Sequence, residues 1–434
     1  MVARYVLALA MAVGCVGSVV AAEDKGPDWN AETLSGDWGG TRTSLYEKGV
    51  ELGFTHKSDV LSNLSGGLKR GTAWMGHTEA RVNLDLEKLL GWDTTTAYVH
   101  FHSDMGSKIN RDYVGAFMGV DNIETAANTA QFYHAWLQKN YGDSLSILAG
   151  LYPIDSEFYV TDTSGIFFQP PYGMANDLAQ TGQNGPPIFP MGSLALRLKY
   201  TAPAKNFYAQ YALMDGVPGD PNEPRGTHIQ LNKGDGTLSI MEFGYTPQEG
   251  SEPAFKPAQS GEMVEPDTRV HEESETFNKT AIGFWRYSSQ FEDMLDPAVR
   301  RTSQGVYFLA ERSLSVEQDH PAQGLSGFVR FGTASKEIHI ADWTGSLGLR
   351  YHGLIAGRDD DIAGIAVTVN HASSAFLTVM PEAKSSETDV EATYRAQINP
   401  WFAVQPTLQY ILNPAMDPAM KNVWVFGVRA EISL

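Results

Sequence analysis

Charged side chains that alternate with apolar ones are the residues whose pattern suggests chemistry in this chain. In "WMGHTEARVNLDL", Glu79 and Arg81 lie on one face of an extended segment and apolar residues lie on the other. The closing segment "WVFGVRAEISL" opposes Arg429 and Glu431 to apolar residues in the same way. Groups of both signs donate and accept hydrogen bonds, which suits an uncharged polar solute, whereas a ring of one sign would select ions.

The same alternation recurs along the chain, so each polar face supplies candidates for the lining of a water-filled interior. The expected lining residues are Arg197, Lys199, Arg330, Arg350, Arg395, Arg429, Glu391 and Glu431, with Asp85, Asp104 and Glu311 as further acidic candidates. The alternative role for any one of them is to hydrate the wall or to pair across strands.

Patterns for metal binding and catalysis are weaker. His100 and His102 in "HFHSD" share a strand face at a spacing that suits a metal ion, but no third ligand is evident nearby. The acidic run Asp359–Asp361 lacks the glycine and glutamate of a calcium loop and fits a solvated loop better. The serine-nucleophile motif G-x-S-x-G does not occur. We therefore predict no metal, no cofactor and no enzymatic activity.

Residues 1–22 have the pattern of a signal peptide. Arg4 precedes an uncharged apolar run that ends in small residues up to Ala22. Cleavage after Ala22 removes Arg4 and Cys15, the only cysteine, so the net charge changes from −19 to −20 and no thiol remains. A lipoprotein signal at Cys15 is the alternative, but it would cut the apolar run in half. The acidic balance argues against a nucleic-acid partner.

An exported chain rich in aromatic residues, with no 18-residue apolar stretch after the signal, can enter a membrane as a closed β-barrel. In a soluble sandwich the apolar faces would instead form the core. The predicted fold class is all-β: a closed antiparallel transmembrane β-barrel of about 16 strands over residues 50–434, after an N-terminal extension with a short helix over residues 23–49. The alternating segments begin near residues 50, 73, 95, 131, 144, 193, 206, 237, 276, 303, 323, 344, 362, 386, 401 and 421.

The connections are expected to alternate in length, as in barrels inserted from one side. Short turns at 141–144 and 398–400 are predicted at the periplasmic end. Long polar stretches at 105–130, 248–275 and 288–302 are predicted as external loops.

The stretch 152–190 is the longest irregular segment. Its prolines and glycines exclude regular structure, while its many Phe and Tyr residues need something to pack against. We expect it to fold inward against the barrel wall and to narrow the pore. An external loop that packs on itself or on a neighbouring subunit is the alternative.

Several motifs together resemble the carbohydrate-selective porins of the OprB type. They are "LSGDWGGTRTSLYEKGVELGF", "LDLEKLLGW", "SEFYVTDTSGIFFQPPYG" and "EATYRAQINPWFAVQPTLQYILNPAMDP", and they span essentially the whole mature chain. The resemblance implies a sixteen-stranded outer-membrane channel that passes sugars by diffusion, with a shallow binding site at a constriction. The chain departs from the family where Gly150 is followed by Leu151 rather than a basic residue, and where it ends in Leu434 rather than an aromatic residue.

A sugar-selective constriction needs charged and amide groups for the hydroxyls and aromatic faces for the C–H surface. Strands two and four and the long loop are expected to supply them. The predicted sugar-contacting residues are Glu79, Arg81, His134, Trp136, Asp155, Glu157 and Phe158.

The motif "LSGDWGGTR" precedes the first strand, so it is expected to act as a structural bracket at the periplasmic mouth. The bracket residues are Asp37, Trp38, Gly39, Gly40 and Arg42. The two glycines permit a tight turn, and Ser44 with Glu47 would form a capping box for the short helix. Asp37 would favour the helix N-terminus and pair with Arg42, and Trp38 would be the buried peg.

The sequence therefore predicts an outer-membrane porin of a Gram-negative bacterium, for passive diffusion of glucose-like monosaccharides or small oligosaccharides. The alternative is a general or anion-tolerant porin without sugar selectivity, with Leu151 as part of the reason. A soluble exported sugar-binding β-protein is a third class. The expected partners are a small-molecule carbohydrate and outer-membrane lipid, and both a monomer and a homotrimer fit the apolar outer faces.

Overall fold

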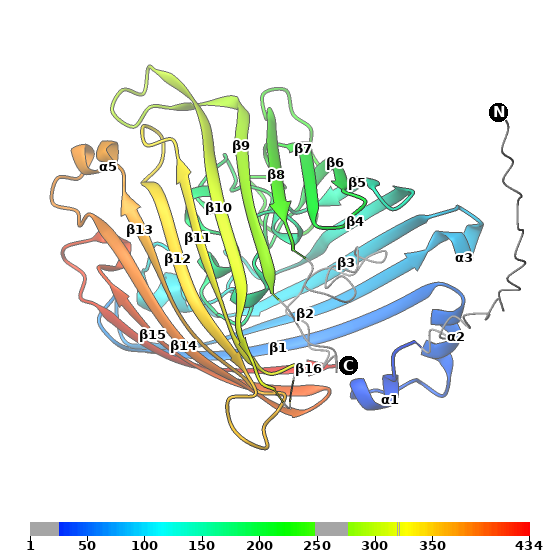
Figure 1. Ribbon diagram of the computed structural model, residues 1–434. Coiled ribbons are helices and arrows are strands. Elements are labelled where there is room, and N and C mark those ends of the chain that lie inside the picture. The colour runs from blue at the N-terminus through cyan, green and yellow to red at the C-terminus, as the bar shows by residue number, and fades with distance from the viewer. Residues whose placement is uncertain (1–25, 248–276, 319, 321) are drawn as a thin grey trace, which may run out of the picture.

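The computed structural model describes residues 26–247, 277–318, 320 and 322–434. Within them, sixteen strands form one closed antiparallel barrel, in which neighbours in sequence pair with each other and β1 pairs with β16 (Figure 1). The strands are β1 (Val50–Ser65), β2 (Gly71–Asp85), β3 (Thr95–Gly106), β4 (Thr129–Tyr141), β5 (Leu145–Tyr152), β6 (Ser193–Thr201), β7 (Phe207–Asp215), β8 (Thr237–Tyr245), β9 (Asn278–Glu292), β10 (Arg300–Val316), β11 (Gly324–Ala334), β12 (Ala341–His352), β13 (Ile362–Ala372), β14 (Ser386–Asn399), β15 (Phe402–Leu412) and β16 (Val423–Ser433). The predicted fold class is confirmed, and every strand begins within three residues of its predicted start. The predicted signal peptide lies outside the described residues.

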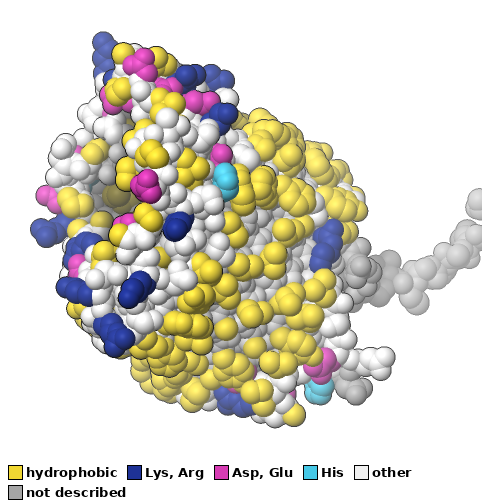
Figure 2. Space-filling model, turned by 90° about the vertical axis from the view of Figure 1, so that its left-hand side faces the viewer, with side chains coloured by type: hydrophobic (Ala, Val, Ile, Leu, Met, Phe, Trp, Pro, Cys, Tyr) yellow, Lys and Arg dark blue, Asp and Glu magenta, His cyan; other side chains and the backbone are white. Residues whose placement is uncertain are grey.

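Period-two alternation separates the two faces of the wall. In β16, Trp424 and Phe426 point outward and are 43% and 45% exposed, whereas Val425, Arg429 and Glu431 point inward and are 0%, 6% and 8% exposed. Figure 2 shows the outcome on one side of the barrel, where hydrophobic side chains form a broad field and most charged side chains gather towards its edges. An apolar outer face and a polar inner face are the arrangement that lipid outside and water inside require.

Helical segments are short and lie in the connections. They are α1 (Trp29–Glu32), α2 (Thr41–Glu47), α3 (Leu86–Leu90), α4 (Asn176–Ala179) and α5 (Ser374–Val379), with single turns at Asn110–Val114, Ile154–Ser156, Asp162–Ser164, Pro170–Tyr172 and Pro414–Met416. None of the helices in the described part of the chain is both long and apolar enough to span a membrane.

Strand direction places the strand ends that flank the long polar stretches. We call the end of the barrel that carries α2 and the C-terminus the terminal end (Figure 1). Each connection after an even-numbered strand returns to this end, so Tyr245 of β8 and Asn278 of β9 both lie there. The external loop predicted at 248–275 lies outside the described residues. Of the predicted external loop at 288–302, residues 288–292 belong to β9 and residues 300–302 to β10.

The bracket before β1 is built on Arg42 rather than on Trp38. Trp38 is 41% exposed, so the prediction of a buried Trp38 is wrong. Arg42 is 1% exposed and donates to Thr33 Oγ1 (2.8 Å), to the carbonyl of Gly36 (3.2 Å) and to Leu434 O (2.7 Å). Its guanidinium also lies 4.3 Å from the centre of the Trp38 ring. The indole therefore covers a buried cation that ties the start of the fold to its last residue.

The cap of α2 also differs from its prediction. The helix begins at Thr41 after Gly40, whose φ of 91° favours glycine, so Ser44 lies inside the helix and the predicted capping box is wrong. Asp37 accepts from Thr43 N at 2.8 Å and from Thr43 Oγ1 at 2.8 Å. Asp37 therefore stabilises the helix N-terminus as expected. The predicted pair between Asp37 and Arg42 is replaced by the hydrogen bonds that Arg42 makes to Thr33, Gly36 and Leu434.

Two loops fold into the barrel rather than out of it. The long loop, residues 153–192, packs its aromatic side chains against inward residues of the wall, as in the ring contact of Tyr159 with Tyr307 of β10 at 4.0 Å. The loop 107–128 also turns inward, with Ile109 and Val120 buried beside Val425 of β16. The inward course predicted for the long loop is confirmed, whereas the inward course of 107–128 was not predicted.

Candidate functional site in the barrel lumen

Carboxylates of the wall fix the course of the long loop. Glu242 of β8 accepts from the backbone N–H of Tyr159 at 2.9 Å. Glu391 of β14 accepts from the N–H groups of Phe168 (2.8 Å) and Gln169 (3.0 Å). A carboxylate that binds N–H groups of irregular backbone satisfies donors that no regular element serves. The loop is therefore held by two strands, β8 and β14, that are six places apart in the ring of sixteen.

Arg330 of β11 holds the same loop through its carbonyls. Its guanidinium donates to the carbonyls of Tyr159 (2.8 Å), Pro171 (3.2 Å), Tyr172 and Gly173 (3.0 Å), and it is 1% exposed. The five N–H donors of arginine suit several acceptors at once. The sequence predicted Arg330 as a lining residue, but the structure places it under the loop as an anchor.

The loop 107–128 is held from β14 and β15 in the same manner. Glu387 accepts from the N–H groups of Phe117 and Met118, both at 2.8 Å. Gln409 of β15 donates to the carbonyl of Val120 at 2.9 Å. Both inward loops therefore depend on inward side chains of the same part of the wall.

Charges of both signs remain partly exposed in the lumen on β1, β2, β14 and β16. The side chains of Lys57 and Arg81 are 13% and 24% exposed, and each lies 3.8 Å from an oxygen of the buried Glu79. Arg395 and Glu431 are 13% and 10% exposed and form an ion pair at 3.2 Å. We call these five residues the first charged arc. Its exposed groups can hydrogen bond to a passing solute while their partners hold them in place.

A second charged arc lies where the long loop meets β6. Glu157 accepts from Arg197 Nε at 2.8 Å, from Lys199 Nζ at 3.3 Å and from the hydroxyl of Tyr152 at 2.6 Å. Burial alone would raise the pKa of Glu157, but Arg197 and Lys199 outweigh it and lower that pKa to about 2. Glu157 is therefore ionised at neutral pH, and its side chain is still 19% exposed.

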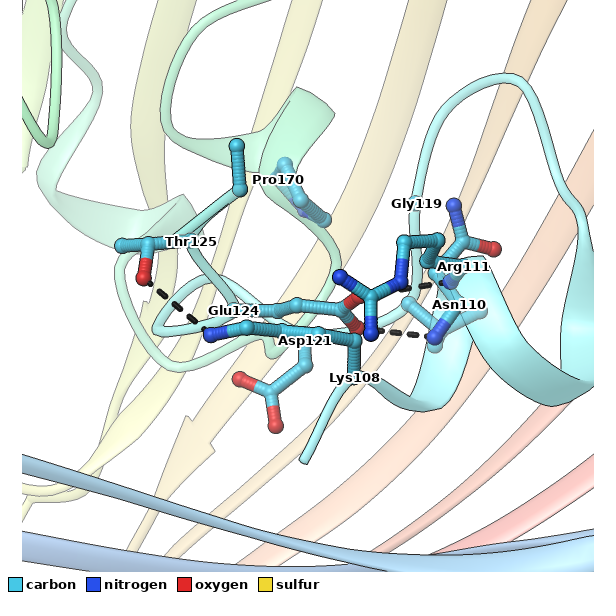
Figure 3. A pocket seen from close by; sticks show the side chains of 10 residues that line it. Lys108, Asn110, Arg111, Gly119, Asp121, Glu124, Thr125 and Pro170 are labelled. Carbon is cyan, nitrogen blue, oxygen red and sulfur yellow. Dashed lines mark hydrogen bonds between the residues drawn. The ribbon is translucent and has the colours of Figure 1, made fainter. Parts of the chain in front are cut away.

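A cavity of about 150 Å³ lies within the loop 107–128 and reaches the long loop at Pro170 (Figure 3). It is lined by Lys108, Asn110, Arg111, Gly119, Val120, Asp121, Glu124, Thr125, Ala126 and Pro170. Glu124 accepts from the N–H groups of Asn110 (2.8 Å) and Arg111 (3.3 Å), and Lys108 Nζ donates to Thr125 Oγ1 at 3.4 Å. Burial raises the pKa of Glu124 and lowers that of Lys108, since each charge is partly desolvated. The cavity thus offers donors and acceptors together.

The predicted sugar-contacting residues fall into two groups. Arg81 and Glu157 reach the lumen, whereas Glu79, His134, Trp136 and Phe158 are buried. His134 accepts from Trp136 Nε1 at 3.4 Å, and Phe158 of the long loop packs in the hydrophobic cluster between that loop and the barrel wall. The buried side chains support the constriction from behind.

Asp155 belongs to the base of the loop. It accepts from the Tyr133 hydroxyl at 2.7 Å and from the N–H of Phe189 at 2.9 Å, so it joins the two ends of the loop to β4. Burial raises its pKa. Its contact with a sugar stays a prediction.

The remaining predicted lining residues have structural partners as well. Arg429 pairs with Asp59 at 2.6 Å and donates to Asn122 of the inward loop. The guanidinium of Arg350 lies 4.9 Å from the centre of the Phe277 ring. In the acidic run at 359–361, Asp361 is buried and pairs with Arg358 at 2.7 Å.

Two residues of the lumen were missed in the sequence. Lys57 lies between the polar residues His56 and Ser58 of β1, so alternation with apolar residues did not single it out, and its pairing with Glu79 of β2 depends on strand register. Lys108 lies in the loop 107–128, where no periodic pattern indicates direction, and only the inward course of that loop places it at the cavity.

Comparisons with known proteins agree with this geometry. The family model described as "Carbohydrate-selective porin, OprB family" matches residues 69–434. Porin B of Pseudomonas aeruginosa is 23% identical over 462 residues, which cover 97% of this chain and 95% of that protein. The putative porin QuiX of Acinetobacter baylyi is 22% identical and covers 92% of each chain. The high-pH structure of Pseudomonas putida OprB superposes with a TM-score of 0.79 at 19% identity, covering 93% of this chain and 99% of that one.

Proposed function

The chain belongs to the carbohydrate-selective porins of the OprB family, and on that premise we propose that its two charged arcs and the cavity at its inward loops guide glucose-like monosaccharides or small oligosaccharides through the lumen. The family consists of channels of the outer membrane. Transport is passive, because a sugar follows its own concentration gradient through a water-filled barrel.

The observation that carries the proposal is the pairing of partly exposed charges of opposite sign around two fixed loops. Arg81 and Lys57 can each donate a hydrogen bond to a sugar hydroxyl, and Glu431 can accept one from a hydroxyl. Their ion-pair partners balance the charge. A neutral solute gains from such pairs, whereas an ion meets attraction and repulsion together. Binding must remain weak, near a millimolar Kd or about −4 kcal/mol, because a tightly held sugar would block its own channel.

The direct test is a single-channel measurement in a planar bilayer. Millimolar glucose or maltose should interrupt the potassium chloride current, with interruptions that become more frequent as the sugar concentration rises. A current that neither sugar changes would refute sugar selectivity and favour a general diffusion porin.

Arg81→Ala tests the first charged arc separately from the family function. We expect it to weaken the sugar block about 3- to 10-fold, corresponding to the loss of roughly 1 kcal/mol for one hydrogen bond. The matched control is Arg300→Ala, which removes an arginine from an ion pair with Glu292 that is more than half exposed. An unchanged block in Arg81→Ala would remove Arg81 from the sugar path, while a block in the wild type would still support the channel function.

Export and assembly follow from the same proposal. Cleavage after Ala22 and insertion into the outer membrane of a Gram-negative bacterium predict a mature N-terminus at Glu23 and recovery with detergent-extracted outer membrane. Native mass spectrometry of the extracted protein distinguishes a monomer from a homotrimer.

A further inference from the structure

Four side chains form a compact group on the inward face of β2 and β3. In the strand register His77 lies opposite Asp104, and Glu79 lies opposite His102. All four are buried, with exposures of 3%, 2%, 3% and 0% in that order. Strand pairing therefore brings together two imidazoles and two carboxylates that are separated by about 25 residues in sequence.

The carboxylate of Asp104 lies between the two imidazoles. Its Oδ1 is 2.6 Å from Nδ1 of His77, and its Oδ2 is 2.7 Å from Nδ1 of His102. Neither His102 Nδ1 nor Asp104 Oδ2 has an aligned hydrogen-bond partner. One donor atom from each of the three side chains lies within 4.8 Å of the others. Two nitrogen donors and a carboxylate that converge in a buried place are ligands that zinc takes in proteins.

The outer nitrogens of both imidazoles have the partners that metal-bound histidines require. Nε2 of His77 lies 2.6 Å from Oε1 of Glu79, and Nε2 of His102 lies 3.1 Å from the carbonyl of Pro190. A carboxylate or carbonyl at this position holds the proton on Nε2 and turns the lone pair of Nδ1 towards the metal. Without a metal, His77 Nδ1 forms a hydrogen bond with Asp104 Oδ1, but His102 Nδ1 and Asp104 Oδ2 lie 2.7 Å apart without an aligned hydrogen bond, a contact that a bound cation would relieve.

We propose that His77, His102 and Asp104 bind one zinc ion through the two Nδ1 atoms and the Asp104 carboxylate. The charges balance, because Asp104 and the outer-shell Glu79 together offset the two positive charges of the ion. Binding displaces any protons from the Nδ1 atoms. The three metal ligands are buried and are not members of the first charged arc, although Glu79, which supports His77, also pairs with Lys57 and Arg81 of that arc.

The zinc site lies beneath the base of the long loop. The ring of Phe189 packs 5.4 Å from the rings of both His77 and His102, and Pro190 is held by His102. Gln131 of β4 also donates to the Pro190 carbonyl at 2.5 Å. Zinc would thus fix the imidazole that anchors the end of the loop, and would join β2 to β3 below it.

The test measures metal directly. The full chain is refolded from urea into detergent with zinc chloride, because the buried site must be loaded before the loop closes over it. It is then desalted and analysed for zinc by mass spectrometry. We expect about one zinc per chain for the wild type and less than a tenth of that for His102→Gln and Asp104→Asn. For Glu79→Gln we expect 10- to 100-fold weaker binding, as for outer-shell partners in general.

The matched control is His371→Gln. His371 and Asp342 also form a histidine–aspartate contact at 2.7 Å, but this pair is about one-quarter to one-third exposed. Zinc content should be unchanged in this variant. Folding of every variant is checked by its altered electrophoretic migration before and after heating.

X-ray absorption at the zinc edge of the wild type keeps the proposal falsifiable if a variant does not fold. We expect nitrogen and oxygen ligands at about 2.0–2.2 Å and the outer scattering of two imidazoles. Less than a tenth of a zinc per wild-type chain, full zinc content in folded His102→Gln, or a shell without imidazole would each overturn the proposal. Because none of these readouts uses sugar, failure here leaves the channel function intact.

Discussion

Glu157 has two roles, one towards the lumen and one in holding the long loop. It is partly exposed to the lumen, and it also ties the long loop to Arg197 and Lys199 of β6. A neutral residue could fill the same volume but could not hold two cations in a partly desolvated place. The group that offers a sugar an acceptor is therefore also a group that keeps the loop in place.

The low pKa of Glu157 makes this tie dependent on pH. Its folded-state pKa of about 2 lies below the ordinary 4.5, so the stabilisation is complete above about pH 4.5 and is lost as the pH falls towards 2. We expect Glu157→Gln to lower the free energy of unfolding at pH 7 by about 2–3 kcal/mol. Urea unfolding in lipid vesicles between pH 7 and pH 2 measures this difference, which should shrink below pH 4.5.

Glu292→Gln is the control for that experiment, since the ion pair of Glu292 with Arg300 is more than half exposed. Its unfolding curve should match the wild type at neutral pH. Equal free energies of unfolding for the wild type and Glu157→Gln at pH 7 would contradict the stabilisation of the loop by Glu157.

At the scale of elements, β14 is the strand on which both inward loops depend. Glu387, Asp389 and Glu391 follow one another on its inward face, and the outer two accept N–H groups from the loops 107–128 and 153–192. The side chain of Gln169 donates to Asp389 at 3.3 Å. Three adjacent carboxylates repel one another, and the hydrogen bonds from these loop donors offset that repulsion. Side chains of the barrel wall therefore hold in place the two loops, 107–128 and 153–192, that narrow the lumen.

Arg330→Met tests whether the loop sets the size of the pore. The change leaves up to four loop carbonyls without their donor, and we expect a loss of about 2–4 kcal/mol of stability, concentrated in the long loop. In bilayers the single-channel conductance should rise, current noise should increase and the sugar block should weaken.

The control is Arg300→Met at the exposed turn between β9 and β10. It should keep the conductance of the wild type. An Arg330→Met channel with unchanged conductance and sugar block would show that the long loop does not limit the pore.

The strands could be predicted from sequence because alternation is local. Trp424 and Arg429 differ in face by simple counting, and neither depends on a distant residue. The contact between His77 and Asp104 depends on the register of two strands, which counting does not give, so only His100 and His102 were paired in the sequence. The inward course of 107–128 was missed for a related reason: Glu387 lies about 270 residues away.

The same limit applies to the side chains of the candidate site. A polar residue on an inward face was expected to meet the solute, yet Arg330 and Glu391 are covered by loop backbone. Whether an inward charge lines the pore or anchors a loop depends on where the loop passes. Its aromatic residues predict that it packs, but they do not predict against which strands.

At the scale of the whole molecule, the barrel is closed by β1 and β16 and by the bracket beside them. The ladder runs from Thr55 opposite Ser433 to Ser65 opposite Trp424. At its terminal end Arg42 donates to Leu434 O, and Leu434 N donates to the carbonyl of Phe54. The final residue is thus bound on both of its sides, although it is not the aromatic residue typical of such barrels.

Arg42→Ala tests the bracket. It removes charge-assisted hydrogen bonds and the contact with Trp38, and we expect a loss of about 2–4 kcal/mol of stability. The temperature at which the folded barrel loses its fast electrophoretic migration should fall. Sugar block should stay as in the wild type, because the bracket lies outside the lumen arcs.

Lys48→Ala, at an exposed position just after α2, is the control and should melt as the wild type does. A melting temperature for Arg42→Ala equal to that of Lys48→Ala would contradict the structural role of the bracket.

The bond from Arg42 to Leu434 also sets an order of events. Its two residues are separated by 392 positions, so the bracket before β1 closes only after β16 has come to lie beside β1. A chain cut short during synthesis would lack the partner of a buried cation at its other end. The bracket before β1 would then lack an acceptor of Arg42, and an unfinished barrel would differ from a finished one at its terminal end.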